Sequence, residues 1–499
     1  MNQSELVSAV SDKSEPFNEE MIFYRERESI IAHLENICRA LEVIEYIKFV
    51  GLDWEDDESK MTAFSTVDIK QARFAEVTMR FRVTYKGETQ DVIKKTFIPR
   101  LVDNFFFIIN GIRYYPIYQI VDRGVFVTPK VYSLKTLLMP IRFKYKRVAM
   151  ADAHDQEFEA HEFKLNLFKN SISYLYYFFA KMGLHGTLGY FGYEYGDGAD
   201  LLLVEADELE DLSAYKKSIF YSFWLKGDLW LIAKKKTFKT EEQKSFLYSL
   251  VEVLSVIGDV EDIEEEWLRV LGSLFTKSAN SRVDKARKVL FSLERILDDE
   301  TKRILSEIKP EDKEDTYSII RWMLREFETH QYQDNVSLRC KRMQCWEYLT
   351  NPLLRFFSNA TYRILNTRNL TIRTLTGVFN IGPNFLTKRL LSNELVRYEG
   401  GVNAIDLFGA SLKVTMRGAG SIGGSGGDVS DRYRGVHKSY VGNLSLVTAS
   451  PGDPGLSAVL TPFANVEEGV FNMLEDELAD KPTKKAKKPA TKKRGREKK

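Results

Sequence analysis

The sequence predicts a mixed protein of helices and strands that spans more than one domain. Residues 72–131 alternate apolar and polar side chains as strands do, whereas residues 241–257 and 281–306 carry apolar residues at helical spacing. Beyond Gly400 the pattern changes again, because fourteen of the thirty glycines fall between residues 400 and 469. With 499 residues, of which 44% are apolar and 12% aromatic, the chain can fill roughly two to four domain cores.

The first part of the chain carries the clearest strand signal. Residues 19–50 are predicted to form one or two helices, and "TMRFRVTYKG", further along, alternates up to a glycine turn. Asn110-Gly111, at the junction of "FFFIING" and "RYYPIYQIV", is the strongest short-range signal for a hairpin.

The middle of the chain is predicted to form a second unit over roughly residues 145–330, with an aromatic segment at 173–180 and a short strand at 201–204 before its helices. From 340 to 398 further helices are expected, interrupted at Asn351-Pro352 and Gly382-Pro383. The glycine-rich part beyond Gly400 should consist of loops on short strands, which lets the backbone approach a ligand closely.

The net charge of +1 hides an asymmetry between the body and the C-terminal tail. Residues 481–499 contain eleven Lys/Arg and one acid, which leaves residues 1–480 with sixty-one basic and seventy acidic residues. The tail has no apolar periodicity, so we expect it to be disordered and to bind a polyphosphate or an acidic surface. Its residues expected to give nonspecific DNA affinity are Lys484, Lys485, Lys487, Lys488, Lys492, Lys493, Arg494 and Arg496.

The cysteines indicate a reducing, intracellular compartment. Cys38, Cys340 and Cys345 are too few for a disulfide framework, and the spacing of the last two matches no paired zinc-ligand motif. The first thirty residues lack an apolar signal core and no run of eighteen apolar residues occurs, so neither secretion nor membrane spanning is indicated.

Three motif-like stretches each have an ordinary interpretation beside the chemical one. "GAGSIG" at 418–423 has the dinucleotide-binding spacing, but the residues after it cannot begin the helix that such a site needs. Asp197 and Asp200 in "YEYGDGAD" are two carboxylates where a magnesium loop has three at alternate positions, which favours a Gly-Asp turn. His154 and His161 have no third fixed ligand, which favours a solvated charged stretch over zinc.

No Walker loop, H-E-x-x-H or G-x-S-x-G motif is present. The chain is therefore expected to contribute to chemistry that another polypeptide completes.

The stretch "FIPRLVDNFFFIINGIRYYPIYQIVDRGVFV" at 97–127 has a proline, then an F-I-I-N-G hairpin, a glutamine step and a Gly-Val-Phe ending. In this order it resembles part of the N-terminal half of the β subunit of multisubunit DNA-directed RNA polymerase. Asn110, Gly111, Gln119 and Gly124 fall in register, whereas the family's Glu-Arg and Ser-Pro are replaced by Arg113-Tyr114 and Asp122-Arg123.

A longer segment, "NAIDLFGASLKVTMRGAGSI" at 403–422, resembles the fork and antibiotic-pocket segment of the same family without a gap. "RGVHKSYVGN" and "TASPGDPGLS" then resemble the family's next two motifs, the second keeping both prolines of a stiff turn. More loosely, "DNVSLRCKRMQCWEYL" at 334–349 resembles the entry into the second protrusion segment. The residues that match in the first three stretches are Asn403, Lys413, Thr415, Gly418, Gly420, Arg434, Val436, His437, Gly442, Pro451 and Pro454.

The resemblance covers about a quarter of the chain and implies an α+β fold with protrusion and lobe domains followed by fork loops. It implies a protrusion from 1–145 and 331–395, a lobe-like insertion at 146–330, fork loops at 396–465 near the active centre, a connecting helix at 466–480 and the tail at 481–499. The chain ends soon after the fork segment, whereas a cellular β subunit continues. We therefore expect a split β subunit, which resembles those of giant tailed bacteriophages.

The resemblance also implies a function in transcription. The chain would be the N-terminal part of split β in a phage-encoded multisubunit DNA-dependent RNA polymerase, forming one side of the channel for DNA and the RNA–DNA hybrid. No catalytic residue, metal or cofactor is expected on this chain, because Mg²⁺ would be held by catalytic aspartates of a β′-like partner. Further expected partners are a C-terminal β-like polypeptide, a promoter-recognition subunit and the nucleic acids, in the cytoplasm of an infected bacterium or in the virion.

Six residues are expected near nucleic acid by this resemblance, the basic ones at phosphates and the histidine orienting loop or RNA groups by hydrogen bonding. The alternatives are that Lys413 and Arg417 are solvated strand ends and that His437 makes a structural hydrogen bond inside its loop. The six are Lys413, Thr415, Arg417, Arg434, His437 and Lys438.

Substitutions in the antibiotic-pocket segment predict resistance to rifamycin. Ala410, Thr415 and Arg417 stand where the family's pocket has His, Ser and Leu. An assembled enzyme that low micromolar rifamycin inhibits would contradict this alignment.

Two other functions stay open at the level of the sequence. One is a non-enzymatic DNA-binding or virion structural protein that uses the basic tail. The other is a self-contained enzyme with a metal at Asp197 and Asp200.

Overall fold

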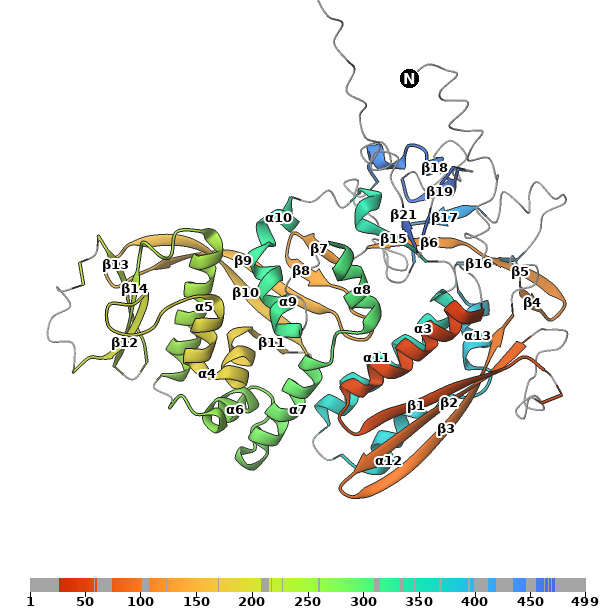
Figure 1. Cartoon of the computed structure of the whole chain (residues 1–499), viewed down its shortest axis with the longest axis horizontal. Coiled ribbons are helices and arrows are strands. Elements are labelled where there is room, and N and C mark those ends of the chain that lie inside the picture. Colours follow the sequence, from red (N-terminus) through yellow and green to blue (C-terminus); the bar gives the residue numbers. More distant parts are fainter. Residues whose placement is uncertain are drawn as a thin grey trace, which may run out of the picture.

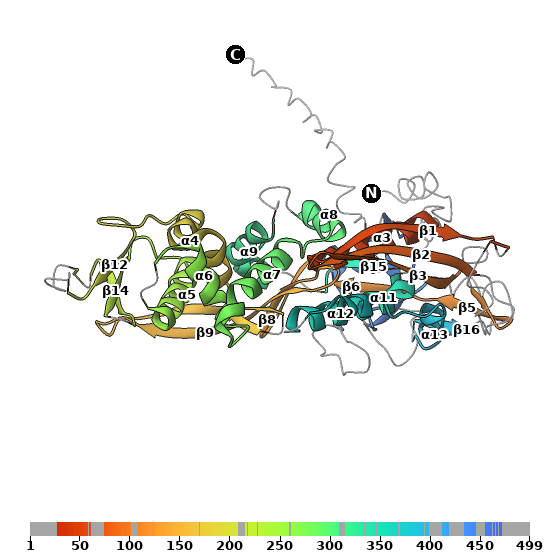
Figure 2. The same cartoon turned by 90° about the horizontal axis from the view of Figure 1, so that it is seen from below.

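The computed structural model describes residues 27–57, 59–60, 74–100, 107–122, 124–168, 170–207, 215–216, 218–226, 228–258, 261–308, 315–332, 336–344, 347–367, 370–393, 395–398, 412–418, 434–445, 455–461, 463–464, 466–467 and 469–471. Helices and sheets alternate along an elongated molecule with two main bodies (Figures 1 and 2), as the mixed prediction requires. Among the helices of these ranges, none combines the length and the apolar character needed to cross a membrane.

The first body is a three-stranded antiparallel sheet packed against a helix that precedes it in the chain and against helices from residues 347–391 (Figure 1). Its centre is Phe81, whose ring lies 4.3 Å from that of Phe379 and 6.2 Å from that of Phe357. Burial of such aromatic rings is the main stabilising term of a core of this kind. The elements are α3 (Arg27–Ala40), β1 (Ile47–Glu55), β2 (Phe74–Tyr85), β3 (Glu88–Pro99), α11 (Glu347–Asn366), α12 (Ile372–Thr376), η6 (Gly377–Phe379) and α13 (Phe385–Leu391).

The second body combines a five-stranded sheet in the order β11-β10-β9-β8-β7, a three-stranded sheet in the order β12-β14-β13 and seven described helices. Its strands are β7 (Val125–Thr128), β8 (Val131–Leu134), β9 (Ile141–Ala151), β10 (Glu157–Leu167), β11 (Asn170–Ser173), β12 (Leu201–Glu205), β13 (Phe220–Trp224) and β14 (Leu229–Lys234). Its helices are α4 (Leu175–Phe191), α5 (Glu241–Ile257), α6 (Glu264–Ser273), α7 (Arg282–Glu294), α8 (Asp299–Ile308), α9 (Thr316–Arg325) and α10 (Phe327–Gln331).

A central sheet lies beside the first body and takes its strands from widely separated stretches (Figure 1). Its order is β15-β6-β17-β19-β18, and the short sheet β16-β5-β4 and the hairpin β20-β21 accompany it. The strands are β4 (Phe107–Ile109), β5 (Ile112–Pro116), β6 (Tyr118–Asp122), β15 (Lys341–Gln344), β16 (Val396–Tyr398), β17 (Lys413–Thr415), β18 (Leu444–Ser445), β19 (Ser457–Leu460), β20 (Val466–Glu467) and β21 (Val470–Phe471). This arrangement confirms, for the described part, the prediction of short strands beyond Gly400.

Several predicted boundaries are corrected. The helical stretch 281–306 is two helices, because the Asp298 carboxylate accepts the Thr301 N–H at 2.8 Å and starts α8 anew. Helix α11 continues through Pro352, because the buried side chains of its later turns hold it on the sheet despite the lost backbone donor. The predicted domain boundary at 145/146 falls inside β9.

Two further predictions fail, one near each end of the described part of the chain. The helix predicted within 19–50 ends at Ala40, and residues 47–50 already belong to β1. The connecting helix predicted at 466–480 is replaced over 466–471 by the hairpin β20-β21, in which Gly469 has a left-handed φ of 83° and accepts the Met343 N–H at 2.7 Å. Residues 472–480 lie outside the described part.

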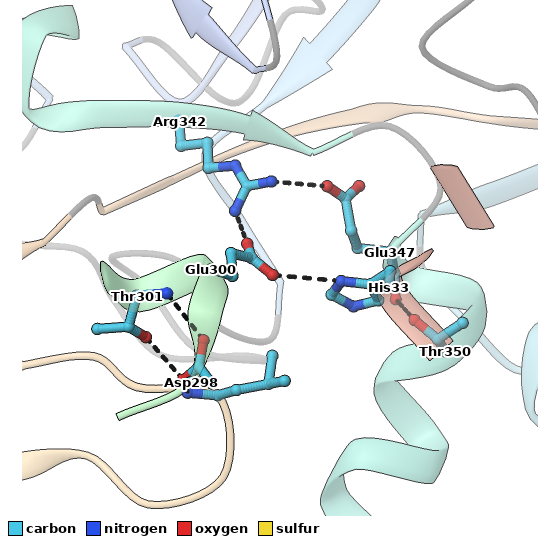
Figure 3. Close-up of polar contacts among 8 residues, drawn as sticks. His33, Asp298, Glu300, Thr301, Arg342, Glu347 and Thr350 are labelled. Atoms are coloured by element: carbon cyan, nitrogen blue, oxygen red, sulfur yellow. Dashed lines mark hydrogen bonds and ion pairs between the residues drawn. The ribbon is translucent and has the colours of Figure 1, made fainter. Parts of the chain in front are cut away.

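A polar cluster, mostly buried, joins the first body to the second (Figure 3). Arg342 of β15 is ion-paired with Glu300 of α8 and lies 3.6 Å from the Glu347 carboxylate at the start of α11. His33 of α3 approaches the second oxygen of Glu300 at 3.3 Å. Burial lowers the pKa of His33 to about 4, with the nearby Arg342 acting in the same direction and Glu347 and Asp298 opposing it, so the ring is neutral at pH 7.

Candidate nucleic-acid interface

The central sheet brings together the segments that the sequence singled out. Strand β6 comes from the 97–127 stretch, β15 from 334–349 and β17 from 403–422, while β18 follows the motif at 434–443 and β19 begins at Ser457, the last residue of the motif at 448–457. Strand β17 runs parallel to β6, with Val414 opposite Tyr118 and Thr415 opposite Gln119. Gln344 of β15 lies opposite Gln119 on the other side. Residues hundreds of positions apart therefore form one continuous surface.

Gln119 of β6 connects this sheet with the backbone that follows β17. Its side chain is buried, and its Nε2 donates to the Arg417 carbonyl at 2.8 Å. This bond holds the backbone just after β17, where Gly418 turns the chain with a φ of 99°. Gln119 thus positions Arg417 from within the sheet.

The predicted hairpin at Asn110-Gly111 is present. Strands β4 and β5 pair directly across it, and both residues have the left-handed φ values, 52° and 74°, that a tight hairpin turn needs. Through β5 the hairpin pairs with β16, so it borders the segment that leads to the glycine-rich part beyond Gly400.

Strand β17 presents one exposed cation and buries its hydroxyl. Lys413 is exposed, whereas the buried Thr415 donates its Oγ1–H to the Leu456 carbonyl at 3.4 Å and accepts the Arg417 N–H at 3.1 Å. Lys413 can therefore reach a phosphate, while Thr415 fixes the course of the backbone into Arg417.

His437 caps a short helix. Its Nδ1 accepts the Ser439 N–H at 3.2 Å and lies 2.9 Å from the Ser439 hydroxyl, at the start of the 3₁₀ helix η8 (Lys438–Tyr440). Because Nδ1 accepts, the proton of the neutral ring lies on Nε2. The structural alternative for His437 is thus present in the geometry, and Lys438 beside it is exposed.

The loop of His437 is tied to two other parts of the chain. The Ser439 hydroxyl accepts the Leu338 N–H at 3.0 Å, which links η8 to η5 (Leu338–Cys340). On the other side, a Cβ at Gly455 would stand 2.2 Å from the Arg434 carbonyl oxygen, and Gly455 has a φ of 76°. Only glycine fits there, so the two motifs pack backbone to backbone.

Gly442 also has a left-handed φ, 81°, and its carbonyl accepts a hydrogen bond from the Thr461 hydroxyl. Gly420, Pro451, Pro454, Ala410 and the tail residues from Lys484 to Arg496 lie outside the described part of the chain.

Two basic residues of the 334–349 segment are buried and have acidic partners. Lys341 is buried and ion-paired with Asp122 of β6, and Arg342 belongs to the cluster of Figure 3. Nearby, burial lowers the pKa of Lys135, although Asp122 at 3.8 Å opposes that shift. The Lys341–Asp122 pair therefore links β15 and β6 of the central sheet.

The alternative sites do not assemble into a metal centre. Asp200 accepts the Thr237 hydroxyl at 2.5 Å and the Glu194 N–H at 3.2 Å, in a turn where Gly196 and Gly198 have left-handed φ. His161 is buried and lies 2.7 Å from a Glu241 oxygen, which corrects the solvated interpretation of its stretch, because β10 packs under α5. In the described ranges no three His, Cys, Asp or Glu side chains come close enough to hold a metal ion.

A second basic surface was not singled out in the sequence. A hollow of about 1340 Å³ lies at the sheet of the second body, lined by five cations, the acids Glu162, Glu241 and Glu328, and the exposed Tyr332. The signal was the basic alternation of "IRFKYKR" along β9, which passes for an ordinary solvated face. The cations are Lys130, Lys144, Lys146, Arg147 and Lys164.

Only part of that charge is compensated inside the protein. Glu162 lies 2.8 Å from Lys146 and 2.8 Å from Lys164, and Glu159 lies 2.6 Å from Arg147. Of the described residues, none forms an ion pair with Lys130 or Lys144. The charges of these two lysines are therefore the ones that an external anion can neutralise.

Comparison with known proteins agrees with the resemblance found in the sequence. The family model described as "Non-virion RNA polymerase subunit" matches residues 3–481, so this chain belongs to that family. A search of the curated proteins returns no match. Membership in a polymerase subunit family connects the chain with nucleotidyl transfer and with other polymerase subunits as partners.

Proposed function

We propose that this chain is the N-terminal part of a split β subunit and that its central sheet borders the RNA–DNA hybrid in the assembled polymerase. The observation that carries the proposal is the convergence of β6, β15 and β17 on one sheet, since these strands come from the stretches that resemble the β subunit. If the resemblance were due to chance, these separate stretches would not be expected to meet in one sheet.

Under this proposal the candidate residues divide into two roles. Lys413, Arg417, Arg434 and Lys438 contact phosphates, which position nucleic acid without reading its sequence. Thr415, His437 and the glycines hold the loops that carry those cations. The hollow with Lys130 and Lys144 offers a further surface to DNA phosphates.

The catalytic centre itself belongs to a partner. The polymerase reaction needs Mg²⁺ held by carboxylates, which polarises the phosphates and the attacking hydroxyl. We assign that site to a β′-like chain and the remaining hybrid contacts to a C-terminal β-like chain, acting in an infected bacterium. The term non-virion in the family's description disfavours the virion alternative.

Site-specific crosslinking in the reconstituted polymerase tests the proposal. A photoreactive residue at Lys413 or Lys438 should crosslink to template DNA or nascent RNA in a stalled elongation complex. The same group at the exposed Lys86, in the turn between β2 and β3, should not. Equal labelling from all three positions, or labelling from Lys86 alone, would refute the placement.

Purification of the tagged chain with its partners gives the broader test. Co-purified chains that resemble the rest of β and β′, together with nucleotide-dependent primer extension, support a split subunit. A lone chain that binds DNA and makes no RNA would favour the non-enzymatic alternative. If activity is present but is lost on replacing Asp197 and Asp200 without disturbing assembly, the self-contained enzyme is favoured.

A further inference from the structure

The hollow at the sheet of the second body has a mixed wall that contact with phosphates alone does not explain. Its volume of about 1340 Å³ exceeds the ~300–1,000 Å³ of small-molecule pockets, so it has room for several units of a polymer. A duplex presents phosphates and groove edges to a protein, whereas a single strand also exposes the flat faces of its bases. Besides cations and acids, the wall holds the apolar and aromatic residues Val127, Pro129, Val131, Tyr145 and Tyr332.

The hollow lies where β9 continues beyond its neighbour β8. The pairing of these two strands covers Ile141 to Lys144 of β9, which then continues to Ala151 with only β10 beside it among the described strands. Lysines of the sheet line one part of the hollow, while Glu328 of α10 and Tyr332 just after that helix line another. The hollow therefore connects basic residues of a sheet with the end of a helix.

Lys144 lies where its charge is unfavourable for the fold. It is directly opposite Lys164 of β10, and like charges directly opposite each other on a sheet are destabilising. Lys164 is compensated by Glu162 at 2.8 Å and by Glu252 at 3.1 Å. Lys144 and Lys130, the residue just before β8, form no ion pair with a described residue, so an external anion would relieve the repulsion.

The acids of the hollow carry less charge than their number suggests. Glu162 is shared between two lysines. Glu241 lies 2.7 Å from Nδ1 of His161 and shares a hydrogen bond with Glu328, which raises the pKa of Glu328, because a hydrogen bond between two carboxyl groups requires a proton. The negative charge of the hollow is thus partly neutralised within the protein, and the uncompensated charge is positive.

Tyr332 adds an aromatic face to the same hollow. The residue is 84% exposed although it lines the hollow. A single exposed aromatic residue is ordinary on a protein surface, but this one shares a hollow with two uncompensated lysines. Cations that follow a backbone, together with an aromatic ring on which a base stacks, are the combination that binds single strands without sequence preference.

We infer that this hollow binds single-stranded nucleic acid, with Lys130 and Lys144 at phosphates and the ring of Tyr332 stacked on a base. The inference rests on the proposed function in taking nucleic acid as the ligand, and it goes beyond that proposal by specifying an unpaired strand at the second body. It also predicts binding by this chain without its partners. Crosslinking from Lys413 in the polymerase without strand binding by the isolated chain would therefore reject this inference alone, and the reverse result would reject the hybrid placement alone.

Fluorescence anisotropy with the full-length chain provides the test. The eleven basic residues of 481–499 are replaced by serine, so that the tail does not bind the probe. The probe is a labelled oligothymidine of about 12 nucleotides, within the ~4–16 nucleotides of comparable sites, and it is compared with a duplex of the same length. The single strand should bind at least about tenfold more tightly than the duplex, because the duplex offers no base face to Tyr332.

Variants separate the two kinds of contact. Tyr332→Ala should weaken binding of the single strand about tenfold without changing its salt dependence, because a stacked base is lost and no charge changes. Lys130→Gln and Lys144→Gln should each reduce the slope of log affinity against log salt by about 0.7, the value for one phosphate contact on a single strand. Tyr398→Ala and Lys86→Gln, at exposed residues outside the hollow, are the matched controls. All five positions are exposed, so the variants should fold, which circular dichroism checks.

Other outcomes overturn the inference. Equal binding of strand and duplex, full binding by Tyr332→Ala, or an equal loss with Tyr398→Ala would each reject it. Competition by a polyglutamate peptide, combined with full binding by Tyr332→Ala, would assign the hollow to an acidic protein segment. A uridine ribo-oligomer of the same length identifies the strand, since tighter binding than the deoxy strand assigns RNA and weaker binding assigns DNA, and both results uphold the inference.

Discussion

A single methyl group at residue 455 would collide with the backbone of the preceding motif. We expect Gly455→Ala to destabilise the packing of these loops by about 2–4 kcal/mol, because an L-residue is strained at a φ of 76° and its Cβ would stand 2.2 Å from the Arg434 oxygen. Hydrogen exchange of residues 434–460 in the full-length chain measures the effect.

Gly51→Ala is the matched control for this substitution. Gly51 lies in β1 with nothing within 4 Å of an added Cβ and without a left-handed φ, so the change should be under about 1 kcal/mol. Similar exchange rates in the two variants would contradict the backbone contact.

His437 offers a test of capping against nucleic-acid contact. His437→Ala should weaken η8 by about 1 kcal/mol, whereas His437→Asn should retain the cap, because an amide oxygen can also accept the Ser439 N–H. We expect the assembled polymerase to keep most of its elongation rate with Asn and to lose more with Ala. An Asn variant with an intact loop but the rate of the Ala variant would instead show that the ring itself is needed.

Residues are predictable from sequence where the constraint is local. Asn110-Gly111 was found because two left-handed positions in succession are a property of the dipeptide itself. The buried role of Thr415 was not found, since its partner Leu456 lies 41 residues away. The burial of Arg342 was not predicted, because it depends on Glu300 of α8, which no local pattern connects with it.

Four elements, α3, α8, α11 and β15, meet in the polar cluster of Figure 3, and the stability that this cluster contributes depends on pH. His33 has a pKa of about 4 in the folded chain and about 6.5 when unfolded, so the unfolded state binds the proton first. The stability that a neutral His33 contributes is complete above about pH 6.5 and is lost as the pH falls toward 4, by about 3 kcal/mol in total.

Chemical denaturation between pH 4 and 7 checks this expectation. His33→Gln, which cannot titrate but can still donate to Glu300, should flatten the profile in that window. His154→Gln provides the control, and the same flattening with either variant would show that the titration is not that of His33.

Elements were predictable where one periodicity runs uninterrupted. The helix at 241–257 has the predicted bounds, because the Thr240 and Gln243 side chains form a capping box at its start. Helix α4 was less clear, since a run of buried aromatics has no polar face, and its break at Gly183 depends on the distant Asp262. The two chain positions cannot be connected by spacing alone.

For the whole molecule, the basic tail should govern the salt dependence of DNA binding. Each phosphate neutralised contributes a slope of about −0.9 in log affinity against log salt, so removing residues 481–499 should reduce the slope by several units while assembly is kept. Titration of DNA at several salt concentrations measures the slope. A tail with its eleven basic residues replaced by serine controls for length, and an unchanged slope would refute the role of the tail.

The order of element types along the chain was predictable, but the edges of the two bodies were not. The order of strand-rich, helical and glycine-rich stretches follows from composition. The start of the second body at β7 does not, because it depends on the pairing of β7 with β8 and of β8 with β9. Which strands share a sheet is decided by packing between distant segments, and single-sequence periodicity carries no information on it.

The central sheet has a consequence for biosynthesis. The Gln119 side chain bonds to a carbonyl 298 residues further along the chain, so this bond can form only after that residue has been synthesised. Strand β19 joins the sheet later still. Contacts of such long sequence separation form slowly, whereas the three-stranded sheet and the second body can gain much of their structure while the ribosome is still working. The candidate interface is then the last surface to form. An incomplete chain lacks this surface, so it cannot take the place of the full-length subunit in the polymerase.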